Sequence, residues 1–243
     1  MRIFLLDNSY KGESLYKMKK KETTYIKKVL RVQIGDSFAA KDVGDNYYKV
    51  TLVEEETLSC VKDDNYNEYL MDSLSKYRDD IIKIHVYQAL CKGKKNETIA
   101  RMMCEAGVYN ITFVKSEFTQ VKTLSKHDIE RLEAIKKEAI QQSGSNSNYE
   151  NPPCIDIYDI LNQIDCPLLV FHQNSNTKTL KERIFALENC KELAILIGSE
   201  GGFSDEEIAK LETRGALTTV LETNILRAET AGIFAIGAIE TCM

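Results

Sequence analysis

The feature that most constrains this fold is a pair of short apolar runs in the C-terminal half of the chain, Leu168–His172 and Leu193–Ile197. Strands with one face in water alternate apolar and polar residues, whereas uninterrupted apolar runs are typical of parallel sheets covered on both faces. Parallel neighbours are joined by crossover connections, which are usually helices. We therefore expect an α/β domain with a mostly parallel sheet.

The surrounding sequence follows this alternation of strand and helix from Ile81 onward. Further strands are expected at 81–90, 111–114 and 218–221, and a last helix from Leu226 to about Glu240. Helix starts are marked by residues that cap a first turn: Asn96, Ser125 with Asp128, and Ser204 with Glu207. The first two of these helices should end at Gly107 and Gly144.

The first 72 residues have a different pattern, with short strands separated by Gly, Asp and Asn. The expected elements are one helix at Glu22–Leu30 and strands at Arg2–Leu6, Ser37–Ala40, Tyr47–Glu54 and Thr57–Lys62. Such strands around one small helix suggest a small barrel. With a polar linker around Asp63–Lys76, we predict a small domain at 1–72 and a larger α/β domain at 73–243.

Charge is distributed unevenly along the chain. The net charge is −5, yet residues 1–31 contain nine Lys and Arg against three Asp and Glu. This basic cluster includes Lys19, Lys20, Lys27 and Arg31. It is either a solvated lysine-rich face or a surface that follows nucleic-acid phosphates, and charge alone leaves both readings open.

Several classes of function find no support in the sequence. Seven cysteines without C-x-x-C spacing and three scattered histidines predict reduced thiols in a cytoplasmic protein and no metal site. The longest apolar run near the C-terminus, Ala231–Ile239, is shorter than the roughly 20 residues of a membrane span, so we expect no membrane association. The absence of G-x-G-x-x-G, phosphate-loop and G-x-S-x-G motifs argues against dinucleotide binding, nucleotide hydrolysis and acyl transfer.

The best candidate for a binding site lies after three strands, because ligands of open parallel sheets bind beyond the carboxyl ends of strands. These strand ends run into His172–Asn174, Gly198–Gly202 and Glu222–Arg227. The three glycines of the second segment permit close backbone approach and positive φ. A helix then begins at Ser204, and its free N–H groups can donate hydrogen bonds to an anion or to polar atoms of a ligand. Taken alone, such a turn is either a ligand loop or only a turn.

Two of these segments resemble motifs of a known family. Leu196–Ser204 reads L-I-G-S-E-G-G-F-S and resembles the I-G-P-E-G-G-F-S signature of RsmE-type ribosomal RNA methyltransferases, members of the SPOUT superfamily. Ile225–Ala231 is similar to their R-[IV]-L-R-T-E-T-A signature. Lys92–Val108 resembles their K-G-x-x-x-E…E-L-G-V segment, and Glu138–Gly144 their E-A-x-E-Q-S-G-R segment. With Arg2–Phe4 and Val29–Asp36, the resemblance spans nearly the whole chain in the same order.

This resemblance implies a fold and an activity. The fold would be a SPOUT α/β domain with a deep C-terminal trefoil knot and a small N-terminal PUA-like β-barrel that helps to hold RNA. The implied cofactor is S-adenosylmethionine. The implied reaction is methylation of uridine N3 in 16S ribosomal RNA, free or in the small ribosomal subunit. The protein would be a homodimer in which each site borrows surface from the partner.

The resemblance also implies roles for individual residues. Arg227 would stand nearest the reacting atoms, where a guanidinium stabilises negative charge on the uridine carbonyl oxygens. Glu200 or Glu229 would accept the N3 proton, although the helix dipole alone also favours a glutamate in a first turn, as at Glu229. The cofactor would lie against Phe171, His172, Gln173, Ile197, Gly198, Gly201, Gly202, Leu221, Thr223, Ile225 and Leu226.

The chain departs from the family mainly by losing arginines. Ser145, Ser147, Asn224 and Phe118 stand at or near family arginines, Glu222-Thr223 replaces a Gly-Pro, and Ser199 replaces a proline. Each lost phosphate contact should weaken RNA binding and reduce its salt dependence. Lys92, Lys94, Lys95 and Arg101 are expected to replace part of the missing charge. Two alternatives stay open: a SPOUT protein that acts on transfer RNA, and a non-catalytic RNA-binding protein of ribosome assembly.

Overall fold

The computed structural model describes residues 3–44, 46–63, 82–145, 147–148, 150, 152–173, 177–187 and 189–242. The chain divides into two compact units, one of Met1–Asp80 with Gln141–Gly144 and the other of Ile81–Ile140 with Ser145–Met243. The predicted boundary between residues 72 and 73 and nearly all of the predicted linker lie outside the described residues. That boundary therefore stays a prediction.

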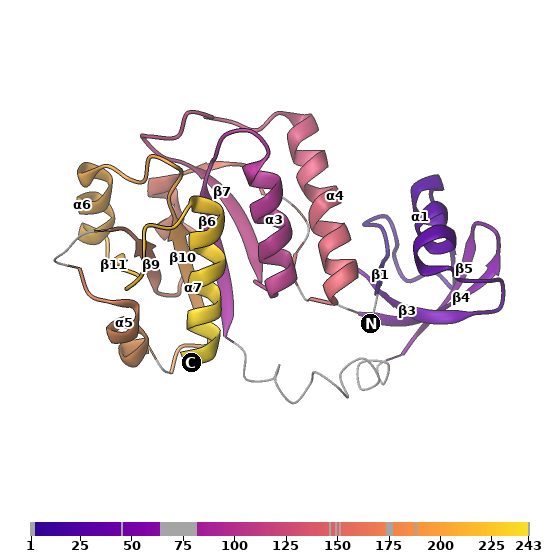
Figure 1. The fold of residues 1–243 in the computed structure, drawn as a ribbon. Coiled ribbons are helices and arrows are strands. Elements are labelled where there is room, and N and C mark those ends of the chain that lie inside the picture. The colour runs from indigo at the N-terminus through magenta and orange to yellow at the C-terminus, as the bar shows by residue number, and fades with distance from the viewer. Residues whose placement is uncertain are drawn as a thin grey trace. The chain divides into compact units, whose positions relative to one another are not determined.

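The described residues of the first unit form a five-stranded sheet in the order β1-β3-β4-β5-β2 and a small helix (Figure 1). Its elements are β1 (Phe4–Leu5), β2 (Leu15–Lys17), α1 (Lys20–Tyr25), a π-helical turn η1 (Ile26–Leu30), β3 (Ser37–Lys41), β4 (Tyr47–Glu54) and β5 (Thr57–Lys62). β1 pairs with β3 in parallel and the other pairs are antiparallel. The predicted strands and helix are confirmed, whereas β2 was missed because three residues carry too little pattern.

The core of this unit follows from alternation along its strands. In β4, Tyr48, Val50 and Leu52 are buried while the residues between them are more exposed, which is the period-2 pattern of a half-buried strand. Tyr10 packs edge-on against Tyr16 and Tyr48, with ring centroids 5.7 and 5.3 Å apart. Such edge-to-face contacts add to the burial of aromatic surface.

The second unit is built on a six-stranded sheet in the order β11-β9-β10-β6-β7-β8, and every pair in it is parallel. The strands are β6 (Lys83–Ala89), β7 (Asn110–Lys115), β8 (Ile155–Asp156), β9 (Leu168–Phe171), β10 (Glu192–Ile197) and β11 (Leu217–Thr219). The helices are α3 (Lys95–Ala106), α4 (Lys126–Ser143), the 3-10 helix η3 (Ile157–Asn162), α5 (Leu180–Leu187), α6 (Asp205–Thr213) and α7 (Ala228–Cys242). The expected parallel α/β sheet is confirmed, while β8, η3 and α5 were not predicted.

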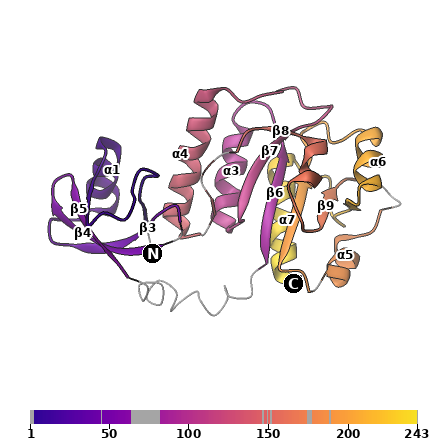
Figure 2. The ribbon, with the colours of Figure 1, turned by 180° about the vertical axis from the view of Figure 1, so that it is seen from behind.

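Helices cover both faces of this sheet, which explains its uninterrupted apolar strands. On one face α3 and α7 lie side by side (Figure 1), and from behind the strands stand in front of them (Figure 2). There Gly232 of α7 fits between Met103 of α3 and Ile197 of β10. On the other face, residues of η3 and α6, including Ile160 and Leu211, pack against the sheet in one buried cluster.

Capping residues follow the sequence prediction with one exception. Ser204 and Glu207 form the expected capping box of α6, and Ser125 pairs with Asp128 at the start of α4. The prediction that Asn96 caps a helix is wrong. α3 begins at Lys95, and the Asn96 amide instead bonds the N–H and carbonyl of Cys91 at 2.9 and 3.0 Å. This buried side chain therefore holds the segment after β6 rather than the helix end.

Two further sequence expectations concern the whole chain. All seven cysteines are free thiols, as predicted. Within the part of the chain that the structure describes, no helix is both long enough and apolar enough to cross a lipid bilayer.

Candidate active site

Three strands that are far apart in sequence end side by side in the second unit. β9 lies between β11 and β10, and Phe171 at its end is in register with both Thr219 and Ile197. The segments that follow these strands therefore meet at one edge of the sheet. This is where the sequence placed a binding site, and a cavity of roughly 310 Å³ lies there.

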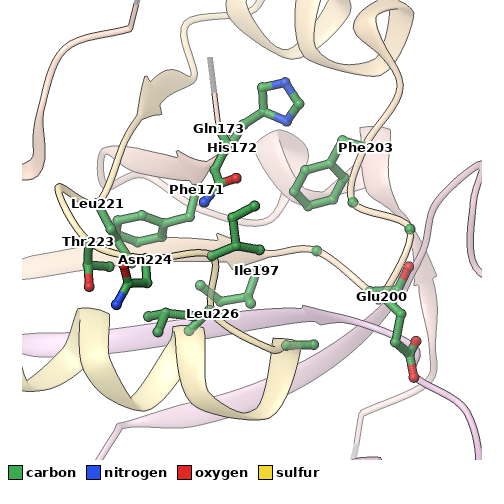
Figure 3. A pocket seen from close by; sticks show the side chains of 17 residues that line it. Phe171, His172, Gln173, Ile197, Glu200, Phe203, Leu221, Thr223, Asn224 and Leu226 are labelled. Atoms are coloured by element: carbon green, nitrogen blue, oxygen red, sulfur yellow. The ribbon is translucent and has the colours of Figure 1, made fainter. Parts of the chain in front are cut away.

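The lining of this cavity contains every residue that was predicted to bind a cofactor. These are Phe171, His172, Gln173, Ile197, Gly198, Gly201, Gly202, Leu221, Thr223, Ile225 and Leu226. The lining also includes Ser199, Glu200, Phe203, Asn224, Ala228 and Ala231. Figure 3 shows Phe171, Leu221 and Thr223 near one end of the pocket and Glu200 near the other. The pocket thus combines apolar side chains with a few polar groups and one carboxylate, as small-molecule sites commonly do.

The glycine-containing loop after β10 has a defined local geometry. The N–H of Gly202 donates to the carbonyl of Ser199 at 3.0 Å, and Gly202 has a φ of +68°, a conformation that L side chains rarely adopt. Ser204 then caps α6. Ser199 is buried, and its hydroxyl oxygen has no hydrogen-bond partner among the described residues.

Gln88 of β6 supports this loop and was not predicted. Its amide donates to the carbonyl of Gly198 at 3.1 Å, and the side chain is fully buried. A buried amide is costly unless it is hydrogen-bonded, so this contact fixes the start of the loop. The available signal was a glutamine next to the carboxyl end of a predicted strand.

A lysine joins the two glutamates that were predicted as proton acceptors. Lys95 Nζ lies 2.8 Å from Glu200 Oε1 and 4.0 Å from Glu229 Oε2. Burial acts to raise the pKa of Glu200, but hydrogen bonds from Lys95 and from backbone N–H groups outweigh it and hold the pKa below its usual value. Glu200 is therefore ionised at neutral pH. Glu229 Oε2 is buried and accepts no hydrogen bond from the described residues.

Arg227 stands at the edge of this arrangement. Its side chain is exposed and is not part of the cavity lining, whereas Leu226 and Ala228 on either side are. Its carbonyl accepts hydrogen bonds from the N–H groups of Thr230 and Ala231 at 2.9 and 2.8 Å and so begins α7. The structure therefore brings Glu200, Glu229 and Lys95 together, with Arg227 on the segment that enters the pocket.

The predicted RNA-binding lysines fall into two groups. Lys19, Lys27 and Lys95 form ion pairs with Asp7 (2.7 Å), Glu55 (3.6 Å) and Glu200 (2.8 Å) respectively. Lys20, Arg31, Lys92 and Lys94 are exposed. Their charges are available to a polyanion, while part of the charge of the first group is already neutralised.

The positions where family arginines are missing also differ among themselves. Ser145 and Ser147 are buried, so they are packing residues rather than surface contacts. Asn224 lines the cavity, and Phe118 is 46% exposed.

The chain is similar in sequence to known methyltransferases. A sequence model of the family described as "RNA methyltransferase domain" matches residues 78–240. A protein from Buchnera aphidicola subsp. Acyrthosiphon pisum, named ribosomal RNA small subunit methyltransferase E, is 27% identical over 231 residues, or 89% of this chain and 84% of the relative. A protein of the same name from Bacillus subtilis is 25% identical over 90% of this chain and 86% of that protein.

A solved structure is similar over almost the full length. It is a methyltransferase from Legionella pneumophila in complex with the bound cofactor SAM, with a TM-score of 0.75 and 25% sequence identity. The alignment covers 98% of this chain and 96% of that one. The similarity therefore includes both compact units and not only the one that carries the cavity.

Proposed function

The chain belongs to the RNA methyltransferase family, and from this premise we propose that it methylates N3 of a uridine in 16S ribosomal RNA with S-adenosylmethionine. The single observation that carries this proposal is the cavity itself, because all eleven residues implied by the motif resemblance line it. The relatives named ribosomal RNA small subunit methyltransferase E support the choice of RNA. The similar structure with bound SAM supports the choice of cofactor.

The residues present suit such a methyl donor. Phe171, Leu221 and Leu226 provide apolar surface for a flat heterocycle, and the volume of roughly 310 Å³ lies at the lower end of the range for ligand sites. The Ser199 hydroxyl, buried without a partner among the described residues, is a polar group that a ligand can satisfy. The bound donor would supply an electrophilic methyl group.

The remaining chemistry falls to side chains of this chain. Uridine N3 carries a proton, so methylation requires its removal and stabilisation of negative charge on the flanking carbonyl oxygens. We assign the charge stabilisation to Arg227, whose exposed guanidinium has no hydrogen bond or ion pair among the described residues and can donate to both carbonyl oxygens. We assign proton acceptance to Glu200 or Glu229, of which Glu200 lines the cavity and Glu229 has one oxygen without a hydrogen bond among the described residues.

We also propose the finer architecture of the family for both units. A trefoil knot is supported by the path after β11, where Val220 bridges to Thr179 and so runs beside the segment that follows β9. A PUA-like barrel is supported by the five short strands and the small helix α1 that the structure describes in the first unit. An experimental structure that traces the last helix without passage through a loop would exclude the knot.

A homodimer is proposed from exposed apolar side chains of the second unit. Phe185 of α5 is 81% exposed, Ile225 of the pocket segment 84% and Phe234 of α7 47%. Exposed large apolar groups commonly mark interaction sites. Sedimentation equilibrium should therefore give twice the monomer mass, and charged substitutions at Phe185 and Phe234 should shift it toward the monomer.

The decisive experiment compares RNA from cells with and without this protein. Mass spectrometry of 16S ribosomal RNA from a deletion strain should show one 3-methyluridine missing, restored by the wild-type gene. Purified protein should methylate small-subunit RNA and not transfer RNA. The opposite preference would point to a transfer RNA enzyme, and absence of S-adenosylmethionine binding by calorimetry would point to a non-catalytic assembly protein.

The assignment of Arg227 has its own test. Arg227→Ala should lower kcat by about two orders of magnitude or more, as removal of one preorganised charge-stabilising group does. Arg101→Ala is the matched control for kcat, since Arg101 is exposed, lies outside the cavity lining and pairs with Glu105 one helical turn away. Full activity of Arg227→Ala would remove the assignment.

A further inference from the structure

The turn after β7 is held rigidly against the glycine-containing loop. The N–H of Glu117 donates to Glu207 Oε1 at 2.7 Å, and Glu207 is the buried N-capping partner at the start of α6. The Ser116 N–H donates to Thr119 Oγ1 at 3.0 Å. Lys122 Nζ donates to the carbonyls of Ser116 and Glu117 at 2.8 and 2.9 Å. Both backbone and side chains thus fix this turn in one conformation.

Phe118 is the large apolar side chain that this rigid turn holds outward. It is 46% exposed, although Ser116 and Thr119 beside it are only 5% and 2% exposed. A Cβ added at Gly201 would lie 2.8 Å from the Phe118 Cβ and 3.6 Å from its Cγ. Phe118 is therefore in direct contact with a glycine of the cavity lining, and only a glycine fits there.

Basic residues also contact the same loop. The N–H of Lys92 donates to Glu200 Oε1 at 3.3 Å, and the side chains of Lys92 and Lys94 are exposed. An exposed ring and nearby lysines together are the elements with which proteins bind single-stranded nucleic acid, because rings stack on bases and lysines pair with phosphates.

We propose that Phe118 stacks on an unpaired base of the acceptor RNA at the mouth of the cofactor cavity. This inference rests on the proposed RNA methyltransferase function and narrows its substrate. A base inside an A-form helix is not open to an aromatic side chain, so the acceptor must be a loop, bulge or extruded nucleotide. In place of the phosphate contact expected of a family arginine near this position, the chain uses a base contact.

A tryptophan reporter tests the stacking directly. The chain contains no tryptophan, so Phe118→Trp introduces a single tryptophan whose emission can be excited apart from that of the twelve tyrosines. Its emission should be quenched when the variant is titrated with small-subunit ribosomal RNA. Tyr109→Trp is the matched control, because Tyr109 is 44% exposed and precedes the amino end of β7 rather than following its carboxyl end. Its emission should not change.

Substitutions separate stacking from packing against Gly201. Phe118→Leu keeps an apolar contact but loses the aromatic face, and it should raise KM for RNA by about fivefold to 150-fold, the range for loss of one stacked base. Phe118→Tyr should behave like the wild type, and the Kd for S-adenosylmethionine should stay unchanged in both. Phe118→Arg should instead make RNA binding steeper in salt by about one unit of log–log slope.

Two results would overturn the stacking role: unquenched Phe118→Trp emission with RNA bound, or wild-type KM in Phe118→Leu. These are distinct from failure of the proposed function, which would show as no methyl transfer by the wild type. The fluorescence titration needs no turnover and reports on stacking in either case.

Discussion

Glu207 does more than an ordinary N-terminal helix residue, because it connects helix α6 to the turn after β7. Its carboxylate accepts hydrogen bonds from the N–H groups of Ser204 at 3.0 Å and Glu117 at 2.7 Å. The first caps α6 and the second anchors the turn after β7. Glu207→Ala removes both bonds and leaves two N–H groups without their acceptor, whereas Glu207→Gln keeps one oxygen.

The expected loss follows from these two bonds. A hydrogen bond to a charged group contributes about 1.5–3 kcal/mol, and water that enters the vacated space offsets part of the loss. We expect Glu207→Ala to lower the free energy of unfolding by about 3 kcal/mol and Glu207→Gln by about half of that. For a protein of this size, 1 kcal/mol corresponds to roughly 2–4 °C in Tm, so Glu207→Ala should lower Tm by about 6–12 °C.

The neighbouring glutamate is a matched control for this measurement. Glu206 is on the same helical turn but pairs with Lys210 on the surface at 2.5 Å, with a side chain 73% exposed. Such exposed pairs contribute about 0.3–0.5 kcal/mol, so Glu206→Ala should hardly change Tm. Thermal unfolding followed by circular dichroism compares the variants, and hydrogen exchange should quicken at the Glu117 amide in Glu207→Ala alone. Equal Tm shifts for both alanine variants would refute the reasoning.

Three further predictions concern charge and backbone. Lys95→Met removes the cation that holds the Glu200 pKa low, so carbon-13 NMR of the Glu200 carboxyl should show that pKa rise, and Lys95→Arg should restore it. Burial lowers the pKa of Lys136 from 10.5 to about 8, so unfolding takes up a proton at pH values between these two. Urea unfolding should therefore show the wild type gaining stability relative to Lys136→Met as pH rises through that range. Gly202→Ala places a side chain at a φ of +68° in the cavity loop and should weaken S-adenosylmethionine binding measured by calorimetry. The control is Gly215→Ala, at a φ of +97° outside the cavity lining, which should lower stability without changing that affinity.

Several features of the site were predictable because they are local in sequence. The apolar run of β10, the glycines after it and the Ser204 cap follow one another within a dozen residues, and strand, turn and helix obey local rules. The motif resemblance further indicated which strand ends form one binding site. For this reason all eleven predicted cofactor residues fall on one cavity.

Other features were not predictable from local pattern. Asparagine is a common helix-capping residue, yet the Asn96 amide bonds the backbone N–H and carbonyl of Cys91. These buried backbone groups need hydrogen-bond partners, which the sequence pattern does not show. β2 and β8 are too short to show a period. Lys95 was expected to bind RNA. It pairs instead with Glu200, which follows a different strand, so local pattern could not predict the contact.

The sequence by itself determined the alternation of strands and helices, the parallel class of the sheet and the loops that carry the pocket, since periodicity and capping act between near neighbours. Only the tertiary structure decided which charges and amides meet. Lys95 and Glu200 are separated by 105 positions, and Gln88 and Gly198 by 110. Such contacts depend on strand order, and strand order is set by how the whole sheet packs rather than by any one segment.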